Sequence, residues 1–236
     1  MSRASIGVGF DFDHTLGADG SLETKAFYIL AQERGHALDE RDPFWRDRIA
    51  ELLRQFRADS VTLDDTVVQF LAALGLPGAA ADAQRYRDIC YGLVDTFVTA
   101  LPGAKDVLAA LAARGIPTAI LTNGWAPLQY HKIARALGYA GPILVSGELG
   151  MSKPAAAAFA KLVDVLGVDR NACWYVGDNP KTDITGAKAA GLHAVWLDEG
   201  VAYPRDAAAP DVRITSLGEL LDALPGQAAW AENSHS

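Results

Sequence analysis

Polar residues of the types that handle phosphate and a divalent metal ion occur at four separate places in the chain. They are Asp11 and Asp13, Thr122 and Asn123, Lys153, and Asp178 and Asp183. Carboxylates that share one site raise one another's pKa unless cations compensate them, and a lysine and a bound divalent cation would do so. Oxygen ligands without His or Cys suit a hard ion such as Mg²⁺, which also uses water and phosphate oxygens. Gathered together, these residues would suit a metal-assisted reaction at a phosphoryl group.

The elements that must position these residues follow from the pattern of apolar residues. Expected strands cover residues 6–10, 117–122, 143–145, 173–176, 193–197 and 212–214, and helical segments such as 104–113 and 154–166 lie between them. Strands that alternate with helices in this way indicate a parallel sheet. In such a sheet ligands bind beyond the carboxyl ends of the strands. Because the polar segments follow strands or open helices at that edge, we expect them to converge there.

A different pattern, from about residue 22 to residue 98, indicates a second unit. Apolar residues recur there at helical spacing, as in the stripe from Phe44 to Phe56, and no strand pattern is strong. The predicted fold class is therefore α/β, with a doubly wound, parallel-sheet, Rossmann-like core and an inserted α-helical cap domain. Residues 1–16 and 100–225 are expected to form the core and residues 17–99 the cap, with 226–236 as a loose tail.

Composition restricts the classes of partner. The chain has 236 residues, half of them hydrophobic, with a formal charge of −8 and a pI near 5.1. An acidic chain without a basic patch is not expected to bind nucleic acid or an anionic membrane, and no run of about 18 apolar residues predicts a membrane span. Cys90 and Cys173 lack partners at metal-ligand spacing, so we expect core residues and a reducing, cytoplasmic setting.

Taken in order, the four polar segments resemble the signature motifs of the haloacid dehalogenase superfamily, in its phosphatase branch (subfamily I) with a helical cap inserted after the first motif. The resemblance covers about residues 6–225. It implies that Asp11 is a nucleophile that becomes phosphorylated and that Asp13 is the general acid and base, with its backbone carbonyl on the metal. Asp11, Asp13 and Asp178 would hold Mg²⁺.

The same resemblance gives roles to the other motif residues. Thr122 and Asn123 would bind phosphate oxygens through a hydroxyl and backbone amides. Lys153 would offset the charge of the nucleophile and of the transferred phosphoryl group, because Pro154 keeps it out of the following helix. Asp183 would lie near the metal or position Lys153, and both roles stay open.

Several alternatives remain at this point. A phosphomutase could use the same motifs, a non-catalytic module would be expected to lack Asp11 or Asp13, and dehalogenating relatives lack the residue that matches Asp13. The sequence thus predicts a Mg²⁺-dependent phosphatase, a phosphoric monoester hydrolase acting on a small phosphorylated metabolite, and leaves the oligomeric state open. His14 is expected in a turn rather than at the substrate. Trp125 is expected either to line the substrate pocket or to lie in the core or face the cap, and one of the cap arginines is a candidate contact for a substrate anion. Those arginines are Arg46, Arg48, Arg54 and Arg57.

Overall fold

The structure, a computed structural model, describes residues 6–58 and 60–225. In chain order its elements are β1 (Gly7–Phe10), β2 (Gly17–Ala18), α1 (Leu22–Glu33), α2 (Pro43–Arg57), α3 (Leu63–Ala73), α4 (Ala80–Phe97), β3 (Thr99–Ala100), α5 (Ala104–Ala113), β4 (Thr118–Thr122), α6 (Leu128–Leu137), β5 (Ile143–Val145), α7 (Ser146–Leu149), α8 (Ala156–Leu166), η1 (Arg170–Ala172), β6 (Cys173–Gly177), η2 (Pro180–Ile184), α9 (Thr185–Ala189), β7 (His193–Leu197), β8 (Val212–Ile214), η3 (Leu217–Glu219) and α10 (Leu220–Ala223). The tail predicted at 226–236 lies outside the described residues.

Six strands form one parallel sheet in the order β5-β4-β1-β6-β7-β8. All six strands predicted from the sequence are present, with ends that shift by one residue at most. The register pairs Phe10 with Ile120 on one side and with Val176 on the other, so β1, β4 and β6 end within two residues of one another. Strands β4 and β5 continue on one side of β1 and β6 to β8 on the other, which makes this junction the expected place for a ligand.

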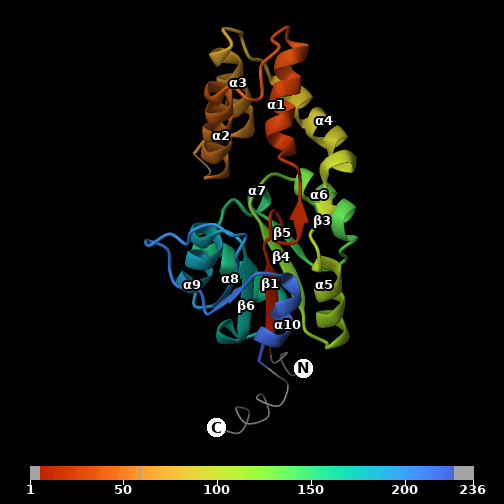
Figure 1. Cartoon of the computed structure of the whole chain (residues 1–236), viewed down its shortest axis with the longest axis vertical. Coiled ribbons are helices and arrows are strands. Elements are labelled where there is room, and N and C mark those ends of the chain that lie inside the picture. The colour runs from red at the N-terminus through yellow and green to blue at the C-terminus, as the bar shows by residue number, and fades with distance from the viewer. Residues whose placement is uncertain (1–5, 59, 226–236) are drawn as a thin grey trace.

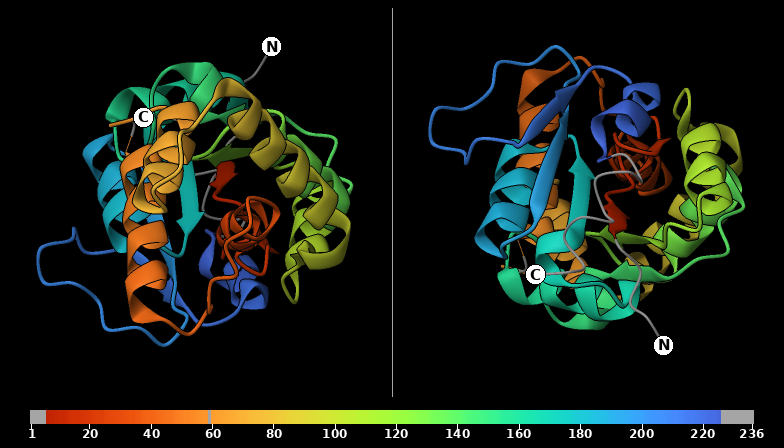
Figure 2. Two further views of the ribbon diagram at one scale, coloured as in Figure 1. Left: turned by 90° about the horizontal axis from the view of Figure 1, so that it is seen from above. Right: turned by 90° about the horizontal axis from the view of Figure 1, so that it is seen from below.

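Helices cover both faces of the sheet (Figures 1 and 2). Val8, Phe10 and Val176 face the apolar cluster that includes residues of α5 and α10, whereas Cys173 and Tyr175 face the cluster that includes residues of α8 and α9. A Cβ atom at Gly9 would lie 2.3 Å from Leu162 Cδ2, so a glycine there lets α8 approach β1 closely. The doubly wound α/β core predicted from the sequence is confirmed.

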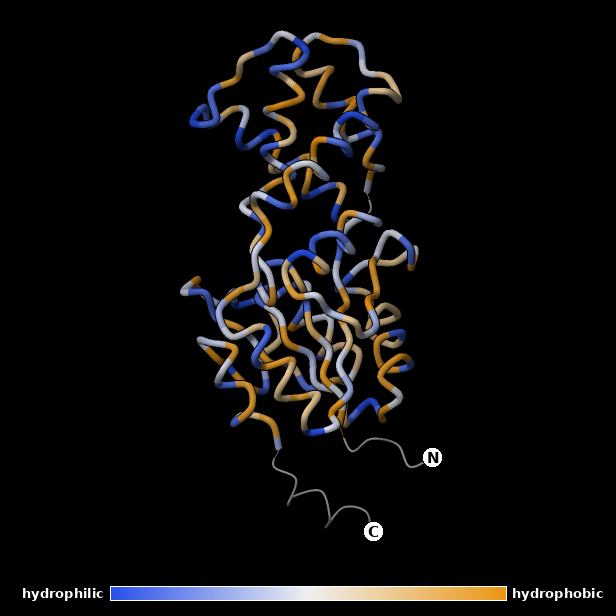
Figure 3. Tube along the Cα trace, turned by 90° about the vertical axis from the view of Figure 1, so that its right-hand side faces the viewer, coloured by the Kyte–Doolittle hydropathy of each residue, from blue (hydrophilic) through white to orange (hydrophobic). Residues whose placement is uncertain are grey.

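The helices α1 to α4 pack on one another above the carboxyl edge of the sheet (Figure 1). Their shared interior is aromatic: the ring of Phe27 lies 4.7 Å from that of Phe70 and 4.4 Å from that of Tyr86, centroid to centroid. Thr62 and Asp65 cap the start of α3 reciprocally. Hydrophobic positions recur along both the helical part and the sheet part of the chain (Figure 3), as expected where each part has an apolar interior.

A short antiparallel pair, β2 with β3, lies where the chain crosses between the two parts. Gly17 pairs with Ala100 and Ala18 with Thr99, so the two crossings run side by side. Our division into a core of residues 1–16 and 100–225 and a cap of residues 17–99 stays a proposal, with this pair as the hinge. Within residues 6–58 and 60–225, no helix has both the length and the apolar character that crossing a membrane requires.

Candidate active site

An acidic centre forms where β1 and β6 end. Asp11 follows β1, Asp178 follows β6 and Asp183 lies in η2, and ligand oxygens of these three residues lie within 4.8 Å of one another. Asp11 and Asp183 are buried, while Asp178 is half-buried. A Cβ at Gly177 would lie 2.4 Å from the Asp183 Cβ, so glycine at this position makes room for the third carboxylate. Three carboxylates with no His or Cys among them fit a hard divalent cation such as Mg²⁺.

Lys153 is the cation of this centre. Its Nζ lies 2.7 Å from Asp11 Oδ1 and 2.7 Å from Asp183 Oδ1, and it donates a hydrogen bond of 3.0 Å to Tyr175 Oη. Burial alone would lower the pKa of Lys153, but the carboxylates of Asp11 and Asp183 raise it well above its ordinary value, so the lysine stays charged. Asp183 thus contacts Lys153 and also belongs to the acidic centre, and both roles that the sequence left open agree with its position.

The pKa values of the carboxyl groups in the acidic centre are raised by burial and by the charges of one another. Burial raises the pKa of Asp11 to about 7, against the lowering effect of Lys153, and the nearby carboxylates add to the rise. Burial, followed by the charge of Asp11, raises the pKa of Asp178 to about 7 as well. A cation bound among them would favour the ionised form of both groups.

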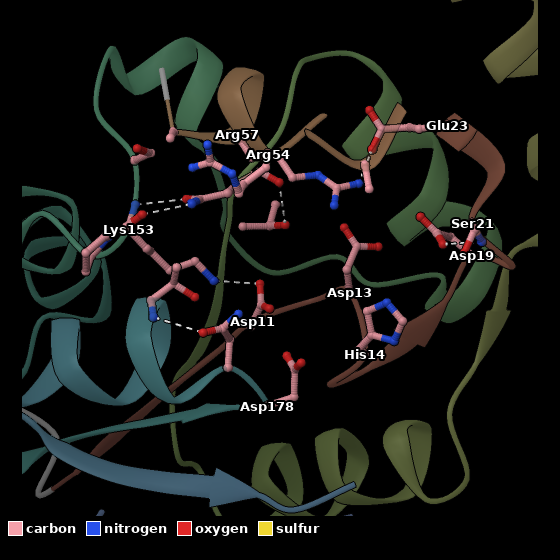
Figure 4. Close-up of a pocket in the computed structure, with 18 of the residues that line it drawn as sticks. Asp11, Asp13, His14, Asp19, Ser21, Glu23, Arg54, Arg57, Lys153 and Asp178 are labelled. Atoms are coloured by element: carbon pink, nitrogen blue, oxygen red, sulfur yellow. Dashed lines mark hydrogen bonds and ion pairs between the residues drawn. The ribbon is translucent and has the colours of Figure 1, made fainter. Parts of the chain in front are cut away.

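Asp13 lies on the other side of the same cavity (Figure 4). Two side chains of the helix α6 hold its carboxyl group. Gln129 Nε2 donates to Asp13 Oδ2 at 2.8 Å, and Lys132 Nζ lies 2.5 Å from Asp13 Oδ1. Sequence reasoning missed both residues of α6. The sequence carried a signal for their burial, because Gln129 and Lys132 fall on the same helical stripe as Ile133 and Ala136, but no signal for their partner.

Thr122 and Asn123, at the end of β4, were both predicted to bind phosphate, and their side chains make different contacts. Thr122 is buried, and its Oγ1 accepts a hydrogen bond of 2.7 Å from Gln129 Nε2. The Asn123 side chain exchanges two hydrogen bonds of 2.9 Å with the backbone of Lys153. It therefore ties the segment after β4 to the segment that carries Lys153, and only the backbone of Asn123 is left to meet a phosphate.

Two of the four cap arginines line the cavity, Arg54 and Arg57, together with Ser21, Glu23 and Thr24. Arg46 and Arg48 are not among the lining residues. Arg57 pairs with the buried carboxylate of Glu23 at 2.7 Å, and Trp125 donates to Glu23 from the core side at 3.2 Å. Trp125 therefore faces the cap, and it is not among the residues that line this cavity, so of the expected placements the cap-facing one is found.

His14, Cys90 and Cys173 lie where the sequence predicted. His14 has a φ of 60° and lines the cavity, in agreement with the expected turn. Cys90 and Cys173 are both buried, as expected of core residues. Burial raises the pKa of the Cys173 thiol to about 12 and raises that of Cys90 further, so both thiols are unreactive at neutral pH.

Comparison with known proteins identifies the family. Residues 7–191 match the model of the haloacid dehalogenase-like hydrolases. This chain belongs to that family. The chain is 38% identical to the phosphoserine phosphatase of Thermus thermophilus over 121 residues, which are 50% of this chain and 49% of that protein. It is 30% identical to the N-acylneuraminate-9-phosphatase of Rattus norvegicus over 228 residues, 90% of this chain and 91% of that protein.

The structural comparison agrees with the family assignment. The magnesium-bound putative HAD-hydrolase YfnB of Bacillus subtilis superposes with a TM-score of 0.75, at 23% identity, over 95% of this chain and all of that one. At that identity the likeness concerns the fold, which is the α/β fold predicted here. The family and its phosphatase members bear out the predicted class of enzyme, a phosphoric monoester hydrolase. The alignment with the Thermus phosphatase spans about half of each chain, and the particular reaction is therefore a proposal.

Proposed function

We propose that this chain is a Mg²⁺-dependent phosphatase that hydrolyses a small phosphorylated metabolite through a phosphoaspartyl intermediate on Asp11. The proposal rests chiefly on one observation. Asp11 is held by the ammonium group of Lys153 within an all-carboxylate centre, and Asp13 opens into the same cavity. These are the parts that an in-line transfer to a carboxylate requires, namely a nucleophile, a cation beside it and a second carboxyl for the leaving group.

Asp11 and Asp178 are the residues that would hold the magnesium ion, together with the Asp13 backbone carbonyl and with Asp183 beside it. When bound, the ion would neutralise the charge that develops on the phosphate oxygens. Lys153 shares this task from the protein side, because its Nζ already contacts the Asp11 carboxylate.

The reaction proceeds in two displacements. Asp11 attacks phosphorus as the ester bond breaks, and Asp13 gives a proton to the leaving oxygen. Asp13 then takes a proton from water as that water attacks phosphorus, which breaks the bond to Asp11 and releases phosphate. The Thr122 hydroxyl and the Asn123 backbone bind phosphate oxygens throughout. The cap residues above the cavity limit access of bulk water.

The cavity limits the size of the substrate. Its volume is about 550 Å³, and both core and cap residues line it. A cavity of this size suits a metabolite rather than a protein. The phosphatase relatives are named for small phosphorylated acids, phosphoserine and N-acylneuraminate 9-phosphate, and Arg54 and Arg57 at the cap side would suit an anionic group on the substrate.

Phosphate release from a panel of small phosphate monoesters tests this function. Wild-type protein is assayed with Mg²⁺ and with EDTA, and Asp11→Asn with Mg²⁺. We expect release that requires metal and is abolished in Asp11→Asn, and the ranking within the panel would indicate the substrate. Release that persists in purified Asp11→Asn would contradict the aspartyl mechanism. Phosphoenzyme that accumulates without free phosphate would indicate a phosphomutase instead.

A further inference from the structure

Lys132 is a buried charge that the proposed mechanism does not yet use. Its side chain is 1% exposed, on the face of α6 that packs against the loop after β1. The Nζ lies 2.5 Å from Asp13 Oδ1 and 2.8 Å from Asp19 Oδ2, and 5.7 Å from the centre of the Phe12 ring. An ammonium group is placed in such a position only if carboxylates there offset its loss of hydration.

The two carboxylates come from opposite ends of one segment. Asp13 lies just after β1, and Asp19 lies just after β2, where the chain enters the first cap helix. Asp19 Oδ1 also accepts a hydrogen bond of 2.9 Å from the backbone N–H of Ser21, which starts that helix. Lys132 therefore ties the Asp13 end of the segment, the entry to the cap and the core helix α6 to one another.

Gln129, one turn earlier on α6, completes the arrangement around Asp13. Its Nε2 donates to Asp13 Oδ2 at 2.8 Å, so each oxygen of this carboxyl is held by a different side chain of α6. The same amide group donates to Thr122 Oγ1 at 2.7 Å. The orientation of Asp13 is thus fixed relative to the segment proposed to bind phosphate, with its carboxyl directed into the cavity (Figure 4).

We propose that Lys132 is a positioning residue that, with Gln129, holds the Asp13 carboxyl in line with the oxygen of the leaving alcohol. This inference rests on the proposed function, since it assigns to Lys132 an action through the general acid of that reaction. Lys132 is not among the residues that line the cavity, so it acts through Asp13. The alternative role is that Lys132 only neutralises the charge of Asp19. That role would require a contact with Asp19 at the cap entry but no contact with the Asp13 oxygen.

The dependence of the rate on the leaving group distinguishes these roles. Phenyl phosphate and p-nitrophenyl phosphate have nearly the same shape, but phenolate is the poorer leaving group and depends more on protonation by a general acid. We would measure kcat/KM for both esters with Mg²⁺, because this constant reports the first displacement. The variants are Lys132→Met, Asp13→Asn as a reference, and Arg135→Met as a control on the solvent face of α6, where Arg135 pairs with the exposed Asp95.

The expected result is selective. Lys132→Met should lower kcat/KM for phenyl phosphate roughly 100-fold, the order of loss that follows displacement of a reacting group by about 1 Å. For p-nitrophenyl phosphate the loss should be below about 10-fold, as in Asp13→Asn, since little protonation is needed. Arg135→Met should match wild type with both esters. The double variant Lys132→Met/Asp19→Asn, which leaves no unpaired carboxylate at the cap entry, should keep the selective loss.

Other results would overturn the assignment. An equal loss for both esters in Lys132→Met, with a selective loss in Asp13→Asn, would show that Lys132 acts on the structure as a whole. Recovery of phenyl phosphate hydrolysis in the double variant would show that Lys132 serves only to neutralise Asp19. Wild-type protein that releases phosphate from neither ester nor from the wider panel would overturn the proposed function itself, and this role with it.

Discussion

Replacing Lys153 with methionine removes the cation that contacts two buried carboxylates and keeps most of the length of the side chain. The Nζ is 2.7 Å from an oxygen of each, Asp11 and Asp183. At an effective dielectric constant of about 20, each contact corresponds to about 6 kcal/mol of Coulomb energy, which is largely offset by the loss of hydration of the lysine. Removal of one partner from a buried ion pair typically costs about 3–5 kcal/mol, and we expect a loss of that size in the free energy of unfolding.

Urea unfolding in metal-free buffer measures this loss. The matched control is Lys188→Met, which breaks a surface pair with Asp211, where both side chains are about a third exposed and a loss of about 0–1 kcal/mol is expected. Mg²⁺ should reduce the loss in Lys153→Met, because a cation among the carboxylates takes over part of the compensation. The rate of phosphate release should still fall by about 10²–10³, as for loss of one group that stabilises a transition-state charge. A Lys153→Met protein that is as stable as wild type without metal would refute this account of the buried charges.

Three further predictions follow from the same geometry. Burial raises the pKa of Asp11 and Asp178 to about 7 without metal, so these groups take up protons on folding and their contribution to stability falls as the pH rises from about 4 to 7. Mg²⁺ should therefore raise Tm more near pH 8, where both carboxylates are ionised, than near pH 5. An equal increase in Tm at both pH values would argue against metal binding at these carboxylates. Cys90 and Cys173 are buried with raised pKa values, so a thiol reagent near pH 8 should label neither in the native protein and both after denaturation, as counted by absorbance. Arg54→Ala should raise KM several-fold for esters that carry a carboxylate and leave p-nitrophenyl phosphate unchanged, since the guanidinium group lies at the cap side of the cavity; steady-state kinetics with both substrates would decide this.

Most of the fold could be predicted because its signals are local. Strands buried on both faces read as short apolar runs, and each was bounded by polar or glycine residues, as at Asp11 and Gly177. The convergence of Asp11, Asp178 and Lys153 followed from the rule that parallel strands share a carboxyl edge, and these side chains do lie together. The β2–β3 pair was not expected, since two-residue strands carry no periodicity.

The residues that hold Asp13 could not be assigned from the sequence because their partners are remote. Lys132 meets Asp13 and Asp19, which lie more than a hundred residues earlier in the chain, and a lysine in an amphipathic helix ordinarily indicates a solvent-exposed position. The sequence predicted that backbone amides of the Thr122–Asn123 segment bind phosphate and made no prediction for the Asn123 side chain. That side chain binds the backbone of Lys153, a contact that depends on how the two segments lie side by side in the fold.

The most direct test of the proposed mechanism is the chemical identity of residue 11 during turnover. Wild-type protein mixed with Mg²⁺ and the best ester of the panel is quenched in acid within milliseconds, and the acyl phosphate is reduced with borohydride, which converts a phosphorylated aspartate to homoserine. Mass spectrometry should find homoserine at position 11 in wild type and none in Asp11→Asn. Two results would contradict the assignment of Asp11 as the nucleophile. One is unmodified Asp11 in a sample that is turning over and in which hydrolysis of the phosphoenzyme limits the rate. The other is homoserine at position 178 and not at position 11.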